Sequence, residues 1–221
     1  MGVLVTFEGI EGCGKTTQMK MAGDYLKERQ IRFIATEEPG GTPLGRKIRE
    51  ILLNKSSFEI GAEAEMLLFF AARAQHVRDV IFPALRDGFW VLCDRFSDAT
   101  IAYQGFGRGI PAENVITQIN HFSSAALKPD LTFLFDLPVE TGLGRAMNRI
   151  AGIRGLPAED RFEHEDMDFH RRVKEGYLTL AKQEPARFRV IDAAGEISAI
   201  QEQVRFHLSV LAAQGSPGKA L

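Results

Sequence analysis

The sequence predicts an α/β fold built on a five-stranded parallel sheet with helices on both faces. Five short apolar runs read as strands, and none of them alternates strictly between apolar and polar residues. Strands covered on both faces of a parallel sheet have this pattern. Helical patterns separate the runs, and this alternation of strands and helices indicates βαβ units. A glycine-rich stretch directly follows the first run.

Each expected strand is a short run rich in apolar residues. In chain order the runs are VLVTF at 3–7, RFIAT at 32–36, WVLCD at 90–94, LTFLFD at 131–136 and RFRVID at 187–192. Helices are expected where apolar residues recur every three or four positions. These segments are Lys15–Gln30, a helix starting at Thr42-Pro43, Ala62–Phe82, Glu113–Leu127, 139–149, Asp168–Lys182 and Ile197–Ala213.

Local signals modify three of these helices. Thr42-Pro43 supplies a cap and a first-turn proline, whereas Pro83 interrupts the long pattern that precedes it. Gly142 and Gly144 weaken the helix at 139–149, because each glycine costs about 1 kcal/mol relative to alanine. The apolar positions of the helix at Glu113–Leu127 are Val115, Ile119 and Phe122.

Length and composition indicate one ordinary globular domain. The chain has 221 residues, of which 45% are hydrophobic and 25% are charged, close to globular averages. We expect a single domain over residues 1–213. A stretch with two glycines and a proline predicts a mobile loop at about 149–163, and the small, polar residues 214–221 predict a frayed tail.

Charge and cysteine content exclude several classes of protein. A formal net charge of −2 gives no general reason to expect nucleic-acid or membrane binding. Cys13 and Cys93 are too few and too far apart for a disulfide framework or a metal motif, and we expect two free thiols. The N-terminus has no signal-peptide pattern and no apolar run could span a membrane, so the cytoplasm is the expected location.

The glycine-rich stretch FEGIEGCGKTTQ predicts a phosphate-binding loop. Gly9-x-x-x-x-Gly14-Lys15-Thr16 follows an expected strand and opens an expected helix, which is the context that the P-loop pattern needs. Its backbone N–H groups and the helix N-terminus favour a polyphosphate, while Lys15 reaches the β- and γ-phosphates and the Thr16 hydroxyl can bind Mg²⁺. The expected ATP-binding residues are Gly9, Ile10, Glu11, Gly12, Cys13, Gly14, Lys15, Thr16 and Thr17.

A guanine-nucleotide switch is disfavoured. Such a protein would need an Asn-Lys-x-Asp motif, but the only Asn-Lys pair, Asn54-Lys55, is followed by two serines. The stretch DAAG at 192–195 fits a switch-like Asp-x-x-Gly, but it comes after the last expected strand.

Three further segments should reach the carboxyl edge of the sheet, where open α/β folds bind ligands. TEEPGGTPLG at 36–45 is either an anion-binding turn or an ordinary β-to-α connection. In LLFFAARAQH at 67–76, Phe69 and Arg73 share a helix face and could hold a flat base, or they could be a core ring and a surface cation. In the third segment Asp94 is placed to organise Mg²⁺, and Arg95 could bind a phosphate or form an exposed ion pair.

The assembly of motifs resembles the thymidylate kinases. FEGIEGCGKTT, EEPGGTPLG, LLFFAARAQH, DRFSDATIAYQGFGRGI and DRFE occur in the order and spacing of that family. The resemblance implies a P-loop nucleoside-monophosphate-kinase fold, the reaction ATP + dTMP → ADP + dTDP with Mg²⁺, and a homodimer. It implies substrate binding by Glu11, Glu38, Phe69, Arg73, Arg95, Thr100, Tyr103 and Gln104, and metal binding by Thr16, Asp94 and Glu11.

Two positions depart from the family pattern. The family usually has arginine before EPGG, where this chain has Glu37, and it often has serine where this chain has Ala99. Thr100 is expected to replace the missing hydroxyl.

Charge stabilisation predicts the remaining catalytic residues. The variable P-loop positions carry no basic residue, so an arginine for the transition state must come from elsewhere. The segment 149–161 resembles a lid that supplies Arg149, Arg154 and Arg161. With Lys15 and Arg95, these three form the expected catalytic set.

Two alternative functions stay open from the residues alone. The first is another P-loop kinase that acts on a different nucleotide or on a nucleoside. The second is a nucleotide-dependent switch without acceptor chemistry. The closely spaced Asp94 and Arg95 suit a phosphate acceptor better than a hydroxyl, which would need a base to remove its proton.

Overall fold

The computed structural model describes residues 2–53, 58–111, 115–152 and 161–214. These ranges contain one parallel sheet of five strands in the order β2-β3-β1-β4-β5. The strands are β1 (Val3–Glu8), β2 (Phe33–Glu37), β3 (Trp90–Asp94), β4 (Leu131–Asp136) and β5 (Phe188–Asp192). The predicted α/β class and all five predicted strands are confirmed.

The helices lie between the strands, as the sequence pattern predicts. They are α1 (Lys15–Glu28), α2 (Pro43–Leu53), α3 (Ala62–His76), α4 (Phe82–Arg86), α5 (Ser97–Thr100), α6 (Thr117–Ser123), α7 (Val139–Gly152), α8 (Met167–Gln183) and α9 (Ile197–Ala213), with π-helical segments η1 (Val77–Ile81) and η2 (Ile101–Gly107). No helix in the described ranges is long and apolar enough to span a membrane. Cys13 and Cys93 are both buried and free.

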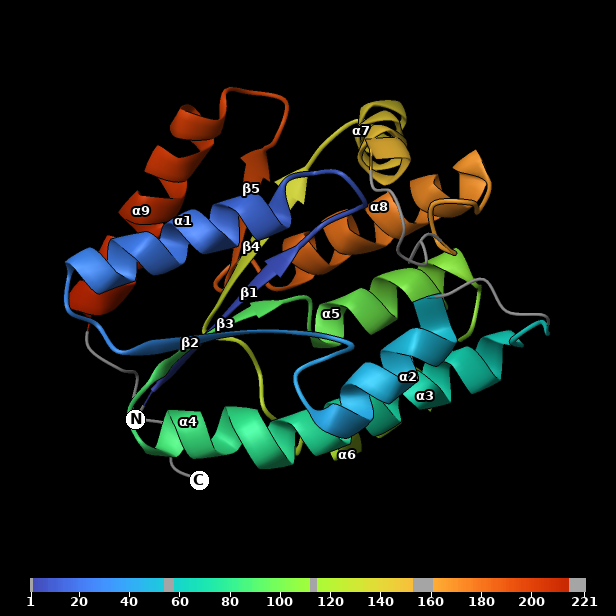
Figure 1. The fold of residues 1–221 in the computed structure, drawn as a ribbon, viewed down its shortest axis with the longest axis horizontal. Coiled ribbons are helices and arrows are strands. Elements are labelled where there is room, and N and C mark those ends of the chain that lie inside the picture. The colour runs from blue at the N-terminus through green and yellow to red at the C-terminus, as the bar shows by residue number, and fades with distance from the viewer. Residues whose placement is uncertain (1, 54–57, 112–114, 153–160, 215–221) are drawn as a thin grey trace.

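The sheet is covered on both faces (Figure 1). Helices α1 and α9 lie together on one side, while α3, η1 and α4 run along the opposite side, and α8 packs beside η2. β1 is buried along its whole length and pairs with β3 on one side and β4 on the other. Because the strand order reverses beside β1, the loop after it opens at the point where such folds bind ligands.

The long helical pattern continues beyond Pro83, which corrects the expected interruption. The chain passes from α3 through η1 into α4, and Phe82 N–H bonds to the Val77 carbonyl five residues back. The wider π turn before the proline rearranges the backbone hydrogen bonds there, so the missing proline N–H does not end the helix.

The glycines of α7 have a packing role. The helix runs from Val139 to Gly152, longer than expected. A Cβ atom on Gly142 would lie 2.5 Å from the Glu11 carbonyl oxygen, and one on Gly12 would lie 2.0 Å from the Gly142 carbonyl oxygen. These two glycines therefore let α7 touch the P-loop, and this contact outweighs their low helix propensity.

The region around α6 buries a different residue from those expected. Ile116 has no exposed surface and packs with Met66 and Phe70 of α3. Phe122, one of the expected apolar positions, is 84% exposed. Val115 and Ile116 are already helical, in a π turn ahead of α6, and Ile119, another expected apolar position, packs partly buried against the same cluster.

Candidate active site

One large cavity opens at the carboxyl edge of the sheet, with a volume of about 820 Å³. It is lined by Glu11, Gly12, Lys15, Thr16, Glu37, Glu38, Pro39, Arg49, Glu50, Leu53, Phe69, Arg73, Asp94, Arg95, Phe96, Ala99, Thr100, Tyr103, Gln104, Arg149, Ile150, Phe162 and Glu163. All the predicted substrate-binding and metal-binding residues are in this set. The cavity therefore brings the P-loop and the three acceptor segments together.

The P-loop forms the turn between β1 and α1. Gly12 and Gly14 have positive φ angles of 68° and 93°, which glycine adopts without strain. Lys15 is buried, and its Nζ donates to the carbonyl oxygens of Gly9 at 3.1 Å and Ile10 at 2.9 Å. The lysine thus braces the loop from inside. Of the other expected ATP-binding residues, Cys13 is buried in the loop and Thr17 is exposed in the first turn of α1.

Thr16 and Asp94 lie together at the cavity wall. The Thr16 hydroxyl donates to Asp94 Oδ2 at 2.8 Å. Both side chains present oxygen atoms, which are the ligands that Mg²⁺ prefers. The described residues contain no group of three or more His, Cys, Asp or Glu side chains that could hold a metal alone. Thr16 and Asp94 therefore fit a Mg²⁺ ion that takes most of its ligands from phosphates and water.

Arg95 joins the P-loop to the acceptor side of the cavity. One guanidinium nitrogen donates to the Gly9 carbonyl at 3.0 Å and to the Tyr177 hydroxyl at 3.0 Å. The other donates to Glu11 Oε1 at 3.0 Å and to the Tyr103 hydroxyl at 2.9 Å. Tyr103 also donates to Glu11 Oε1. The backbone of Arg95 has a φ of 66°, a left-handed conformation that is uncommon for residues other than glycine.

Glu8, at the end of β1, and Glu11, in the P-loop, are three residues apart, and their pKa values are shifted in opposite directions. Burial, helped by the Asp98 charge, raises the pKa of Glu8 to about 8. Burial also favours a raised pKa at Glu11, but the contact with His170 and the charges of Arg95 and Lys15 outweigh it and lower the pKa to about 2. We assign most of this lowering to the charges, because His170 Nδ1 lies 3.3 Å from Glu11 Oε2 without hydrogen-bond alignment.

Arg73 lies in a fully built pocket of hydrogen-bond acceptors. Only 1% of it is exposed. Its guanidinium donates to Glu38 Oε2 at 2.8 Å, Asn120 Oδ1 at 3.1 Å, the Phe96 carbonyl at 2.9 Å and Thr100 Oγ1 at 2.9 Å. The Thr100 hydroxyl thus supports Arg73. A guanidinium has five N–H donors, so one of them stays for a ligand in the cavity.

Glu38 is the buried counter-charge of Arg73. Its second oxygen contacts His76 Nδ1 at 2.9 Å, and His76 Nε2 contacts the Thr36 hydroxyl at 2.7 Å. Burial alone would raise the pKa of Glu38, but Arg73 and the His76 contact lower it overall. The EPGG turn therefore holds the carboxylate that orients Arg73.

Aromatic rings line the wall next to Arg73. Phe69 of α3 and Tyr103 of η2 both pack against Phe162, with ring centroids 6.2 and 5.5 Å apart. Gln104 lies beside Tyr103 and donates to Glu65 Oε1 at 2.8 Å. A flat apolar wall with one amide at its edge suits a heterocyclic base.

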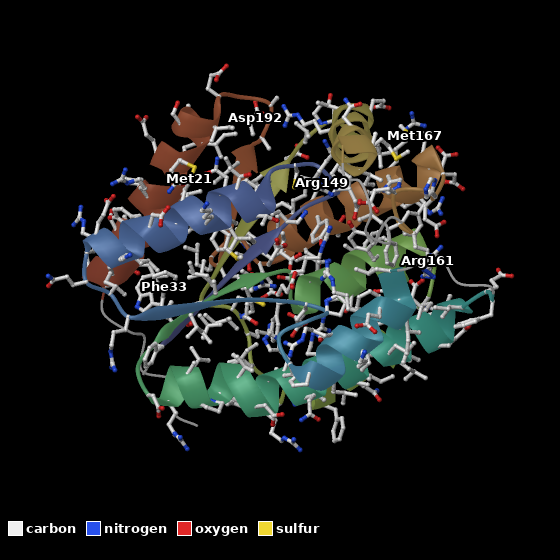
Figure 2. All side chains as sticks on the ribbon, in the orientation of Figure 1. Met21, Phe33, Arg149, Arg161, Met167 and Asp192 are labelled. Atoms are coloured by element: carbon white, nitrogen blue, oxygen red, sulfur yellow. The ribbon has the colours of Figure 1, made fainter. Side chains whose placement is uncertain are left out.

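The three expected lid arginines have different outcomes. Arg149, at the end of α7, lines the cavity, is 61% exposed and lies 3.6 Å from Glu163 Oε1. Arg161 bonds to the buried Glu65 and is not among the cavity residues. Arg154 lies outside the described residues. Figure 2 shows Arg149 near the centre, below α7, and Arg161 to the right, beside the end of η2.

Several cavity residues were not predicted. Arg49 of α2 donates to the Pro39 carbonyl at 2.8 Å and lies 3.3 Å from Glu37 Oε2. Leu53, four positions later, lines the same wall. Arg49 and Leu53 are four positions apart, so the sequence alone could have predicted that they share one face of α2. Phe162 and Glu163 belong to the DRFE motif, which contributed to the family resemblance but was given no role in the site, because their place in the cavity depends on long-range packing. Burial and the Glu11 charge raise the pKa of Glu163.

Comparison with known proteins agrees with this geometry. The family model described as Thymidylate kinase matches residues 7–204. Thymidylate kinase from Syntrophus aciditrophicus (strain SB) is 59% identical over 218 residues, 99% of each chain. Thymidylate kinase from Geotalea daltonii is 50% identical over 89% of this chain and 92% of its own.

A solved structure is similar along almost its whole length. The crystal structure of thymidylate kinase from Ehrlichia chaffeensis has a TM-score of 0.74 and 33% sequence identity, and the match covers 94% of this chain and 98% of that one. Sequence, fold and cavity therefore lead to one conclusion: the chain belongs to the thymidylate kinase family.

Proposed function

We propose that this protein transfers the γ-phosphoryl group of ATP to dTMP, giving dTDP and ADP. One observation carries the proposal: the P-loop residues Lys15 and Thr16 line the same cavity as Phe69, Arg73 and Arg95. Two nucleotides bound to these two groups would have their phosphates facing each other. Had the two groups faced opposite sides of the molecule, no direct transfer would be possible.

The acceptor needs no general base. A phosphate oxygen of dTMP is already an oxyanion, so it attacks the γ-phosphorus directly while the bond to the bridging oxygen of ADP breaks. Arg73 and Phe69 orient the base, and Arg95 orients the acceptor phosphate. Catalysis then consists mainly of positioning the two groups and stabilising negative charge on the transferred phosphoryl group.

Two cationic side chains support the charge stabilisation. Lys15 exchanges its loop carbonyls for the β- and γ-phosphates when ATP binds. Arg149 is exposed, so it can turn toward the transferred group. Thr16 and Asp94 would hold Mg²⁺, with Glu11 nearby. When bound, Mg²⁺ neutralises charge on the phosphate oxygens.

The assembly is proposed to be a homodimer. Three apolar side chains on or near α3 and α6 are exposed: Leu67, Val115 and Phe122. Burying them against a second copy removes apolar surface from water. Sedimentation should show a dimer in the wild type and a monomer after Phe122→Glu; a monomeric wild type would contradict this part of the proposal. The expected cytoplasmic location stays a prediction.

A coupled assay of ADP release tests the reaction. The wild-type protein is given ATP and Mg²⁺ with dTMP, dUMP, dCMP, UMP or thymidine. We expect the highest kcat/KM with dTMP, no release with Lys15→Met, and loss of release with a chelator of Mg²⁺. A preference for another acceptor would indicate a different kinase. Tight ATP binding without any acceptor-dependent release would indicate a nucleotide-dependent switch.

A further inference from the structure

A buried ionic cluster lies behind the base-binding wall. Its centre is Glu65 of α3, which has no exposed surface. Gln104 Nε2 donates to Glu65 Oε1 at 2.8 Å, and Arg108 donates to both carboxylate oxygens, at 3.2 and 3.0 Å. Arg161 donates to Oε2. Of these four described residues, Gln104 is the one that lines the cavity.

The cluster is held together across three separate segments. Arg108 also donates to Glu165 Oε1 at 2.6 Å and stacks over the Phe169 ring, 4.7 Å from its centroid. Arg161 N–H bonds to the Leu53 carbonyl at 3.3 Å. Two guanidinium groups thus compensate one buried carboxylate, an arrangement that is stable only when all partners are present. Glu65 therefore has little freedom to move.

The charge of Glu65 decides which way the Gln104 amide points. A carboxylate between two guanidinium groups accepts hydrogen bonds and donates none. A primary amide beside such a group must turn its NH₂ toward it. The amide oxygen, Oε1, then points away from Glu65 and is the group that Gln104 can offer to the cavity.

We propose that Glu65 is a positioning residue for base selection: it holds Gln104 so that an acceptor oxygen, and not an N–H, faces the nucleobase. The inference rests on the proposed function, since it concerns which base the same acceptor site takes. Thymine offers an N3–H donor, which complements this oxygen. Cytosine has an unprotonated N3, which is itself a hydrogen-bond acceptor. It would be repelled by the amide oxygen and could not form a hydrogen bond with it.

Glu65→Gln tests the proposal with little change of volume. The new side chain carries its own NH₂, which conflicts with the NH₂ of Gln104. Rotation of the Gln104 amide relieves this conflict and turns an N–H toward the base. We expect kcat/KM for dTMP to fall roughly tenfold or more, and the dTMP-to-dCMP ratio of kcat/KM to fall by a similar factor. The KM for ATP should stay within about twofold.

A purely structural role for Glu65 would give a different result. It would lower activity with dTMP and dCMP by the same factor and leave their ratio unchanged, which would overturn the proposal. The comparison is made with dCMP both as a substrate and as a competitive inhibitor of dTMP phosphorylation, so that weak turnover of dCMP does not hide the ratio.

Two further variants cover the possibility that Glu65→Gln does not fold. Glu65→Asp keeps the charge near Arg108 and Arg161 but withdraws the oxygen from Gln104, so the ratio should fall in the same direction. In a Gln104→Leu background, either change at Glu65 should leave the ratio unmoved. A further fall in that background would show that Glu65 does not act through Gln104.

The wild-type measurement separates the two proposals. If the wild type releases no ADP with dTMP, the proposed function fails. If it phosphorylates dTMP but the dTMP-to-dCMP ratio is unchanged in Glu65→Gln and Glu65→Asp, the proposed function stands and only the role of Glu65 is wrong.

Discussion

The base-binding wall around Phe69 and Arg73 and the phosphate-transfer end around Lys15 and Arg149 are built differently, although they line the same cavity. On the wall, Arg73 is 1% exposed and makes four hydrogen bonds to the protein. At the transfer end, Arg149 is 61% exposed and its charge partner Glu163 is 3.6 Å away. One arginine is held in place before any ligand binds, whereas the other can move.

The difference corresponds to two tasks. A base must be oriented in the ground state, so its partners gain from being rigid and already desolvated. Charge on the transferred phosphoryl group develops in the transition state, so its cation is needed at that moment. If this cation were buried at the transfer end before ATP binds, it would need a permanent negative partner, because an unpaired buried charge is strongly destabilising. We therefore expect substitutions on the wall to change mainly KM and stability, and those at the transfer end to change mainly kcat.

Arg149→Ala tests the transfer end and should have the largest effect. We expect kcat to fall about 10³-fold, because a cation that stabilises the transferred group is lost. The melting temperature should hardly change, since the side chain is exposed. Steady-state kinetics and thermal melting check both parts.

Arg149→Lys is the matched control, because it keeps the charge without the planar guanidinium; it should recover part of the lost rate. Arg154→Ala examines the second lid arginine that the sequence predicts. Wild-type turnover in both alanine variants would contradict the lid hypothesis.

Arg73→Met tests the wall. We expect KM for dTMP to rise about 100-fold, because an oriented, desolvated donor is lost. The fold should also lose about 3–5 kcal/mol of stability, since Glu38 would be left buried without its arginine. Kinetics and denaturant unfolding measure the two effects.

The double variant Arg73→Met with Glu38→Gln separates binding from stability. It removes the unpaired charge, so stability should recover in part while KM for dTMP stays high. A fall of KM toward the wild-type value would mean that Arg73 acts on the fold alone.

Glu8→Gln tests how a buried carboxyl group at the end of β1, next to the P-loop, affects stability. The pKa of Glu8 is raised from 4.5 to about 8, so between these pH values the folded protein keeps a proton that the unfolded chain has lost. Stability from this group is therefore complete below about pH 4.5 and falls as the pH rises toward 8. The stability of Glu8→Gln should therefore not decline in this way as the pH rises.

Thermal melting from pH 5 to 8 measures the effect. The melting temperature of Glu8→Gln relative to wild type should rise by several degrees across this window, at about 2–4 °C per kcal/mol for a chain of this size. Parallel curves would show that Glu8 does not carry the pH dependence. Glu11 has the opposite sign: its lowered pKa predicts stability lost as the pH falls from 4.5 toward 2.

Of these substitutions, Glu37→Gln should have the smallest effect on the kinetics. Glu37 is half exposed and lies 3.3 Å from Arg49. Glu37 lines the cavity, so removing its negative charge lowers the repulsion of the dTMP phosphate, and KM for dTMP should fall by about two- to fivefold, in the range of an exposed charge interaction. Raising the salt concentration should shrink the difference; a rise in KM would contradict this reading.

The sheet, the P-loop and most of the residues that line the cavity could be predicted from patterns in the amino-acid sequence. Strand runs, helix periods and the Gly9–Thr16 spacing are local patterns, and the carboxyl ends of parallel strands meet at one edge. Asp94, Arg95 and the P-loop could therefore be brought together without a structure. Phe69 and Arg73 share a helix face, so their side of α3 could be predicted too.

The pairing of the buried charges could not be predicted, because it depends on contacts between elements far apart in the chain. Glu65 meets Gln104 and Arg161 across 39 and 96 residues of chain, and Glu38 meets Arg73 across 35. No local pattern records such contacts, because they depend on how separate elements pack. The same reason explains why Arg161, expected in the cavity, bonds to a buried carboxylate, and why Gly142 belongs in a helix that its propensity disfavours.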